Sequence, residues 1–169
     1  MTPPPDDKKE LTPLARALGR IPSGLYVVTT EAPAQAGGGP LGFVGSFVIQ
    51  VGFDPPTICV AVGAGRDHLA AMRGCGRFAI SVLDEASSGV MGEFFKKRED
   101  GSTPFDDLAT SKSAAGSTVL SDALAWVDCE ISGEHETGDH VVVFGRAIEG
   151  AITRDGEPKM HTRKNGLGY

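Results

Sequence analysis

The chain has 169 residues, of which 40% are hydrophobic and 22% are charged, and its formal net charge is −6. This length and composition predict one domain that is large enough to bury a core. The acidic balance argues against binding of nucleic acid or an anionic membrane, because proteins that bind these usually carry a basic surface. No apolar run is long enough to span a bilayer.

Residues 1–10 are polar and rich in proline, and they lack the apolar stretch of a secretory signal. We therefore expect a disordered tail at residues 1–10 and one domain at residues 11–169. The cysteines, Cys59, Cys75 and Cys129, match neither a zinc site nor a C-x-x-C redox pair. Cys59 and Cys129 lie in apolar runs, where a free thiol behaves as a small hydrophobic side chain. These features predict a reduced, cytoplasmic protein.

The first predicted element is a short helix that begins after Thr12, a suitable N-cap, and ends at Gly19. Its apolar face consists of Leu11, Leu14 and Leu18. A strand is predicted over 24–30, followed by a glycine-rich turn and a long strand over 41–53. Asp54-Pro55-Pro56 ends that strand, because proline has no N–H to donate to a sheet.

The next segment alternates, with Ile58, Val60 and Val62 on one face, and predicts a strand over 57–62. A short helix over 69–73 follows, with Asp67 as its cap and Gly74 as its end. Another strand is predicted around Phe78, Ile80 and Val82. A third helix starts at Ser87 or Ser88 and continues to Phe95.

The last third of the chain begins with a polar stretch, 99–120, that predicts irregular structure. Two strands, 126–133 and 139–149, face each other across a hairpin turn, and Asp155-Gly156 is the strongest tight-turn signal. Six or more strands with only two or three short helices predict a mainly β protein, a barrel with helices at its ends.

A glycine-rich turn, Gly63-Ala64-Gly65-Arg66-Asp67-His68, follows a strand and opens a helix, as a dinucleotide fingerprint does. His68 replaces the third glycine and would block close helix–strand packing, so the turn argues against a Rossmann site. Arg66 and His68 at the start of a helix still suit a phosphate. The alternative is a polar turn whose charges are solvated.

Glycines also interrupt the strand around Gly42 and Gly45, which is typical either of a ligand that approaches the backbone or of a bend at a barrel corner. His135 and His140 straddle a turn with no third histidine or cysteine nearby, so we predict no metal site. The chain has no G-x-S-x-G motif, which argues against serine hydrolase chemistry.

Four segments in order resemble the flavin reductase family of FMN-binding split barrels. They are Ser46–Pro56, Gly76–Leu83, Leu120–Cys129 continued by Gly138-Asp139-His140, and His161–Tyr169. The last segment is most similar to the reductase modules of diflavin proteins. The resemblance covers about residues 12–169 and implies an FMN-binding, Greek-key-like split β-barrel with a few short peripheral helices.

The same resemblance implies roles for particular residues. The residues expected to contact the flavin ring and ribityl chain are Val44, Gly45, Ser46, Phe47 and Val48. The turn expected near the phosphate carries Arg66, Asp67 and His68. The side chains expected around the flavin face where nicotinamide docks are the catalytic candidate His140 and the substrate-binding candidates His161, Arg163 and Tyr169. Two positions depart from the family pattern: Gly45 replaces Ala or Ser, and Thr162 replaces a second histidine.

The implied activity is NAD(P)H-dependent reduction of FMN, with FAD as a second flavin and either NADH or NADPH as co-substrate. A monooxygenase, a ferric chelate or free flavin would accept the electrons. Two other functions stay open: an FMN-binding electron-transfer protein that does not use NAD(P)H, and an oxidase of the pyridoxamine-phosphate type.

The resemblance also implies a homodimer with FMN at or beside the subunit interface. Strands with little polar alternation, Leu25–Thr30 and Val141–Phe144, predict cover on both faces, which a second copy can supply. The alternative is that residues 99–120 fold over these strands and leave a monomer.

Overall fold

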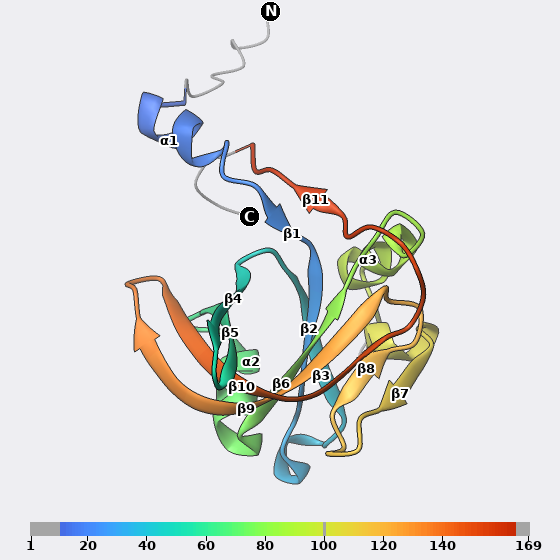
Figure 1. Ribbon diagram of the computed structural model, residues 1–169. Coiled ribbons are helices and arrows are strands. Elements are labelled where there is room, and N and C mark those ends of the chain that lie inside the picture. The colour runs from blue at the N-terminus through green and yellow to red at the C-terminus, as the bar shows by residue number, and fades with distance from the viewer. Residues whose placement is uncertain (1–10, 100, 165–169) are drawn as a thin grey trace, which may run out of the picture.

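The computed structural model describes residues 11–99 and 101–164, so the predicted disordered tail at residues 1–10 lies outside the described residues. A seven-stranded antiparallel sheet, in the order β3-β2-β6-β9-β10-β5-β4, curls into an open barrel (Figure 1). Its strands are β2 (Tyr26–Glu31), β3 (Pro40–Gly45), β4 (Val48–Phe53), β5 (Pro56–Gly63), β6 (Arg77–Val82), β9 (Ala125–Glu136) and β10 (His140–Ile152). The predicted mainly β split-barrel fold is confirmed.

Short elements surround the barrel. The helices are α1 (Pro13–Leu18), α2 (Asp67–Cys75), α3 (Ser88–Phe95), and the 3-10 turns η1 (Ala34–Ala36) and η2 (Pro104–Asp107). Strand β7 (Thr110–Lys112) pairs with β8 (Thr118–Leu120), and β1 (Ser23–Gly24) pairs with β11 (Met160–His161). Helix α1 and the β1–β11 ribbon form an arm that extends from one end of the barrel (Figure 1). None of the described helices is both long and apolar enough to cross a membrane.

The main core lies inside the curled sheet and beneath α2. Val60 and Val143 stand opposite each other on β5 and β10, and both are buried against Phe78 and Met72. A second hydrophobic core cluster, which includes Val27, lies between β2, β8 and α3. Strand β2 is therefore buried on both faces, as its lack of polar alternation predicts.

The segment over 99–120 differs from the irregular structure that we predict. It contains η2, β7 and β8, and all residues of β8 are buried. The Thr29 hydroxyl donates to the Thr118 carbonyl, which ties β8 to β2. Residues of the same chain thus cover the second face of β2. The polar composition of 99–120 does not indicate this cover, because its buried residues form only a short strand.

The long strand predicted over 41–53 is two strands, and the break at Ser46-Phe47 has a topological reason. Strand β3 lies at one edge of the sheet and β4 at the other edge. The chain must cross the opening of the barrel between them, and Ser46 and Phe47 make that crossing.

Two other boundaries also differ from the prediction. Helix α2 continues through Gly74 and ends at Gly76, whose φ of +71° is a left-handed conformation that glycine adopts without strain. Residues 154 and 155 form a bend in the strap between β10 and β11, and not a hairpin.

Candidate functional site

The site is built on the outer face of β4, β5 and β10. Ile49 stands opposite Cys59, and Ala61 stands opposite Val142. Side chains alternate between the two faces of a strand, so these residues point outward while Val60 points into the core. Residues paired directly across strands share a face, and the result is an apolar floor.

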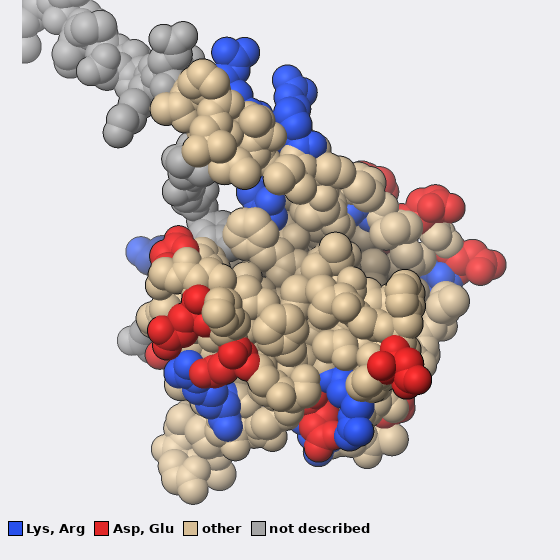
Figure 2. Space-filling view, turned by 60° about the vertical axis from the view of Figure 1, so that its left-hand side comes forward, with Lys and Arg blue, Asp and Glu red and all other residues tan. Residues whose placement is uncertain are grey.

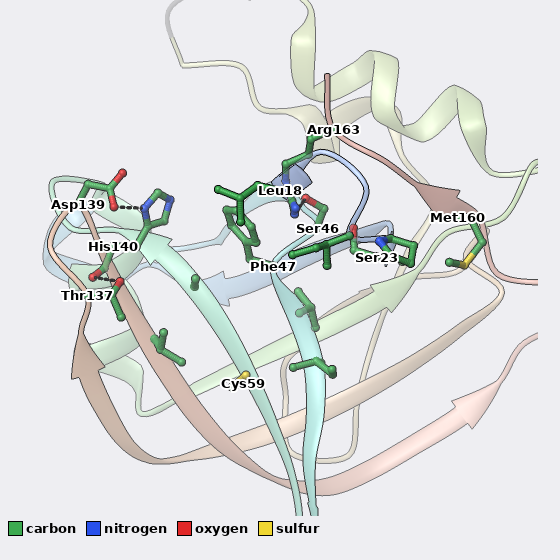
Figure 3. A pocket seen from close by; sticks show the side chains of 17 residues that line it. Leu18, Ser23, Ser46, Phe47, Cys59, Thr137, Asp139, His140, Met160 and Arg163 are labelled. Carbon is green, nitrogen blue, oxygen red and sulfur yellow. Dashed lines mark hydrogen bonds and ion pairs between the residues drawn. The ribbon is translucent and has the colours of Figure 1, made fainter. Parts of the chain in front are cut away.

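A cavity of about 780 Å³ lies over this floor, within the range that small-molecule sites usually have (Figure 3). Its other walls come from segments far apart in the sequence. The arm contributes Leu18, Ile21, Pro22, Ser23, Gly24 and Met160, and the segment after β11 contributes Arg163. Ser46 and Phe47 line it from the crossing between the edge strands, and Val48 lines it from the start of β4.

Arg163 ties the segment after β11 to that crossing. Its guanidinium carbon lies 3.8 Å from the centroid of the Phe47 ring, and its Nη2 donates to Ser46 Oγ over 2.6 Å. The opposite side of the site is held by an edge-to-face contact between Phe47 and His140, with ring centroids 5.8 Å apart. Phe47 therefore lies between the two polar side chains that frame the cavity (Figure 3).

One end of the cavity is polar and belongs to the turn between β9 and β10. His140 Nδ1 lies 3.0 Å from Asp139 Oδ1, and this hydrogen bond lowers the pKa of the Asp139 carboxyl. The carboxylate is thus ionised at neutral pH and accepts, which makes Nδ1 the donor. The Thr137 N–H and hydroxyl both donate to the His140 carbonyl, over 2.8 and 3.1 Å. These bonds fix the turn.

One buried hydroxyl in the cavity wall is unsatisfied. Ser23 Oγ is buried and has no hydrogen-bond partner among the described residues. Leaving such a group unpaired costs about 1–3 kcal/mol. A ligand with polar atoms on its rim would satisfy it.

The predicted phosphate turn begins beside the polar end but does not line the cavity. The Ala64 N–H donates to the Asp139 carbonyl over 3.0 Å, and Arg66 and Asp67 are exposed. His68 points inward, where Nε2 lies 3.1 Å from the Gly42 carbonyl and the ring contacts Phe43. Since a carbonyl only accepts, Nε2 is the donor, and burial lowers the pKa of His68. The phosphate role of this turn stays a prediction.

The structure brings together only part of the predicted set. Val44 packs in the second core cluster, and a Cβ on Gly45 would lie 3.3 Å from the Phe43 and Val28 side chains, a tight fit that accounts for the glycine. His161 pairs with Ser23 in the β1–β11 ribbon and does not line the cavity. Tyr169 lies outside the described residues.

Several cavity residues were not predicted as site residues from the sequence. Asp139 and Thr137 neighbour His140, so their position in a turn was an available signal. Ile21, Pro22 and Met160 carry no local signal, because they reach the cavity only through the pairing of β1 with β11. Within the described ranges, no three His, Cys, Asp or Glu side chains gather as a metal site would require.

The sequence profile of the flavin reductase like domain matches residues 18–166. The chain therefore belongs to the flavin reductase like family, as its sequence motifs predict.

The relatives include proteins much longer than this chain. Diflavin flavoprotein A 1 of Synechocystis is 34% identical over 92% of this chain and 27% of its own length. A probable flavin reductase of Rhizobium meliloti is 33% identical over 92% of this chain and 45% of its own length. A homologue of nitrilotriacetate monooxygenase component B from Mycobacterium thermoresistibile has a similar structure, with a TM-score of 0.77 and 26% identity over 88% of this chain and 80% of that one.

Proposed function

We propose that residues 11–169 form an FMN-binding domain that reduces flavin with NADH or NADPH. The observation that carries this proposal is the apolar cavity over β4, β5 and β10, with Ser23 and Ser46 on one side and His140 on the other. A flat heteroaromatic ring has apolar faces and a polar rim, and this cavity offers matching surfaces.

The residues present fit a flavin. The small side chains of Cys59 and Ala61 leave room for a ring system close to the floor. The unpaired hydroxyl of Ser23 can bond to the rim of the ring. The turn that carries the exposed Arg66 lies next to the polar end, because the Ala64 N–H of this turn donates to the Asp139 carbonyl. FMN is the preferred flavin because this turn can receive its phosphate.

The bound flavin would accept a hydride from the reduced nicotinamide. The chain contributes position and the exclusion of water, which supply most of the rate when no covalent step is needed. Phe47 and Arg163 close one side of the cavity, and His140 holds a proton on Nδ1 against Asp139 at the other.

We also propose that two copies pair, with the cavity at or beside their interface. The arm exposes Leu14 and Ile21 at 68% and 56%, and edge strand β4 exposes Ile49 and Phe53 at 62% and 90%. Large apolar side chains exposed in this number favour an interaction site on the arm and on β4. Because the arm is also the roof of the cavity, a partner that covers the arm would border the flavin.

The electron acceptor is proposed from a relative. The similar structure from Mycobacterium thermoresistibile is a homologue of a monooxygenase component, which favours a partner monooxygenase among the possible acceptors. The three cysteines are unpaired, as in a reducing compartment, and we place the protein in the cytoplasm.

Equilibrium dialysis against FMN tests the binding proposal. Ala61→Leu fills the floor of the cavity and should weaken FMN binding at least about tenfold through steric exclusion. Ala151→Leu adds the same atoms at an exposed position of β10 outside the cavity and should bind FMN as the wild type does. Wild-type protein without saturable FMN binding would contradict the proposal.

One further experiment distinguishes the two alternative functions from the proposed one. A protein that holds FMN only for electron transfer would bind FMN and show no reduction by NADH or NADPH. An enzyme of the pyridoxamine-phosphate oxidase type would oxidise that substrate instead. A change in the flavin spectrum on addition of each compound distinguishes them.

A further inference from the structure

A second cavity, of about 550 Å³, lies between α1 and residues 162–164, which follow β11. Its charged lining residues are Arg16, Arg20, Arg163 and Lys164, and none of its described lining residues is acidic. This concentration of positive charge stands out in a chain with a net charge of −6. Figure 2 shows Lys and Arg side chains on the arm, while the acidic side chains in view lie on the barrel.

Among the described residues, no acidic side chain pairs with these cations. Within 11–99 and 101–164, the ion pairs of lysine and arginine use Arg73, Lys96, Arg98, Lys112, Arg146, Arg154 and Lys159. The C-terminal end of α1 favours one nearby cation, Arg16, in its last turn. It does not account for a cluster drawn from both ends of the chain, where like charges repel each other.

One side chain connects this basic cavity to the apolar one. Arg163 lines both, and its guanidinium lies over Phe47 while it donates to Ser46. A ligand whose ring lies on the apolar floor can therefore extend past Arg163 toward Arg16 and Arg20. The ligand must be long, with an aromatic ring at one end and negative charge further along.

We propose that the basic cavity binds the diphosphate of a dinucleotide, that is, the adenosine diphosphate half of either NAD(P)H or FAD. This inference rests on the proposed flavin reductase function and assigns a second subsite to it. Arginine suits the role because its planar fork bonds phosphate oxygens in pairs. FMN alone would not occupy this subsite.

Titration calorimetry with ADP-ribose tests the subsite without flavin or turnover. Wild-type protein should bind ADP-ribose, and the double variant Arg16→Gln/Arg20→Gln should bind it at least about tenfold more weakly, since charge-assisted hydrogen bonds are lost. Lys97→Gln/Arg146→Gln removes the same charge at exposed positions outside both cavities and should leave the affinity unchanged. Absence of ADP-ribose binding, or equal losses in the two double variants, would overturn the inference.

Two comparisons identify the dinucleotide that supplies the diphosphate: KM for NADH against KM for reduced nicotinamide mononucleotide, and affinity for FAD against affinity for FMN. If the nicotinamide nucleotide uses the subsite, Arg16→Gln/Arg20→Gln raises KM for NADH and leaves KM for reduced nicotinamide mononucleotide unchanged. If FAD uses the subsite, the variant weakens the binding of FAD and leaves the binding of FMN unaffected. Either result supports the subsite. If the variant changes neither the ratio of the two KM values nor the ratio of the FAD and FMN affinities, the subsite is contradicted. ADP-ribose binding in a protein that does not reduce flavin would retain the subsite and reject the proposed function, whereas efficient flavin reduction without ADP-ribose binding would do the reverse.

Discussion

Two residues of the β9–β10 turn, Thr137 and Asp139, position His140 at the polar end of the cavity. The Asp139 carboxylate, whose pKa is lowered by the hydrogen bond from His140, is ionised at neutral pH and fixes the proton of His140 on Nδ1. Thr137 holds the backbone of His140 with both its N–H and its hydroxyl. The imidazole is therefore positioned by its own turn, while Phe47 restrains it from the side.

His140→Ala should slow reduction of bound FMN by NADH or NADPH at least about tenfold, because the co-substrate loses a positioning contact. FMN affinity should change little, since the floor of the cavity is intact. Stopped-flow absorbance on FMN-loaded protein measures the rate, and His135→Ala, an exposed histidine outside the cavity, is the control. An unchanged rate in His140→Ala would identify His140 as an ordinary hairpin residue.

Arg66→Ala should weaken FMN binding by about 1.5–3 kcal/mol and leave riboflavin binding almost unchanged. The reason is that a guanidinium can pair with a phosphate that riboflavin lacks. Fluorescence titration with both flavins gives the two affinities. Equal losses for the two ligands would mean that Arg66 is a solvated surface charge.

At the scale of elements, the strap between β10 and β11 determines where Arg163 lies. The strap is attached to the end of β6 by buried Asp84, which accepts hydrogen bonds from Arg154, 2.5 Å away, and from Ser87. The Lys159 N–H donates to the Leu83 carbonyl further along. These bonds fix the path of the strap before it reaches the cavity.

The Asp84 anchor makes stability depend on pH in a defined direction. The hydrogen bond from Arg154, followed by that from Ser87, lowers the pKa of Asp84 from 3.8 to about 2. The stabilisation is therefore complete above the unfolded pKa and is lost as pH falls from about 4 toward 2. Thermal melting should show wild type more stable than Asp84→Asn at pH 7, with the difference shrinking over that acidic range. A difference that stays constant down to pH 2 would contradict this assignment.

Strand β10 passes close to β9 and the core at Gly145. A Cβ there would lie 2.5 Å from the Phe78 ring and 2.8 Å from Cys129 Cβ, so Gly145→Ala should destabilise the protein by about 1–3 kcal/mol. Gly133→Ala, on β9, meets nothing within 4 Å and should have a much smaller effect. Urea unfolding of both variants measures the difference, and equal destabilisation would show that the backbone is free to shift.

The elements that could be predicted from the sequence are those with local patterns. Thr12 caps α1 through a hydrogen bond to the Ala15 N–H, and the alternation around Val60 marks β5. The break at Ser46-Phe47 could not be predicted, because both halves of the apolar run favour strands and only the sheet order requires the crossing. Likewise Ile21 and Met160 enter the cavity through pairing over a long sequence distance.

For the whole molecule, the distribution of apolar surface is uneven. The arm and edge strand β4 expose large apolar side chains, whereas β2 is covered by residues of the same chain. The exposed apolar surface that a second copy can cover therefore lies on the arm and on β4, and not on β2. The sequence predicts cover on both faces for two strands, and residues of the same chain provide it for only one of them, β2.

Light scattering on FMN-loaded protein at micromolar concentration should give a mass near twice 17.6 kDa. Leu14→Glu places a charge on the exposed apolar face of α1 and should shift the mass toward one chain. Phe95→Glu changes an equally exposed apolar residue on α3, which is not part of the arm, and should not. A wild-type mass near 17.6 kDa would contradict the dimer.

The central claim is that the apolar cavity holds a flavin that a nicotinamide nucleotide reduces. The most direct test is anaerobic mixing of FMN-loaded protein with NADH and, separately, with NADPH, while the absorbance of oxidised flavin is followed. The account predicts a saturable loss of that absorbance with at least one nucleotide, and a clearly weaker response in Ala61→Leu than in Ala151→Leu at equal FMN. Stable oxidised flavin with both nucleotides, in protein that has bound FMN, would contradict the reductase function.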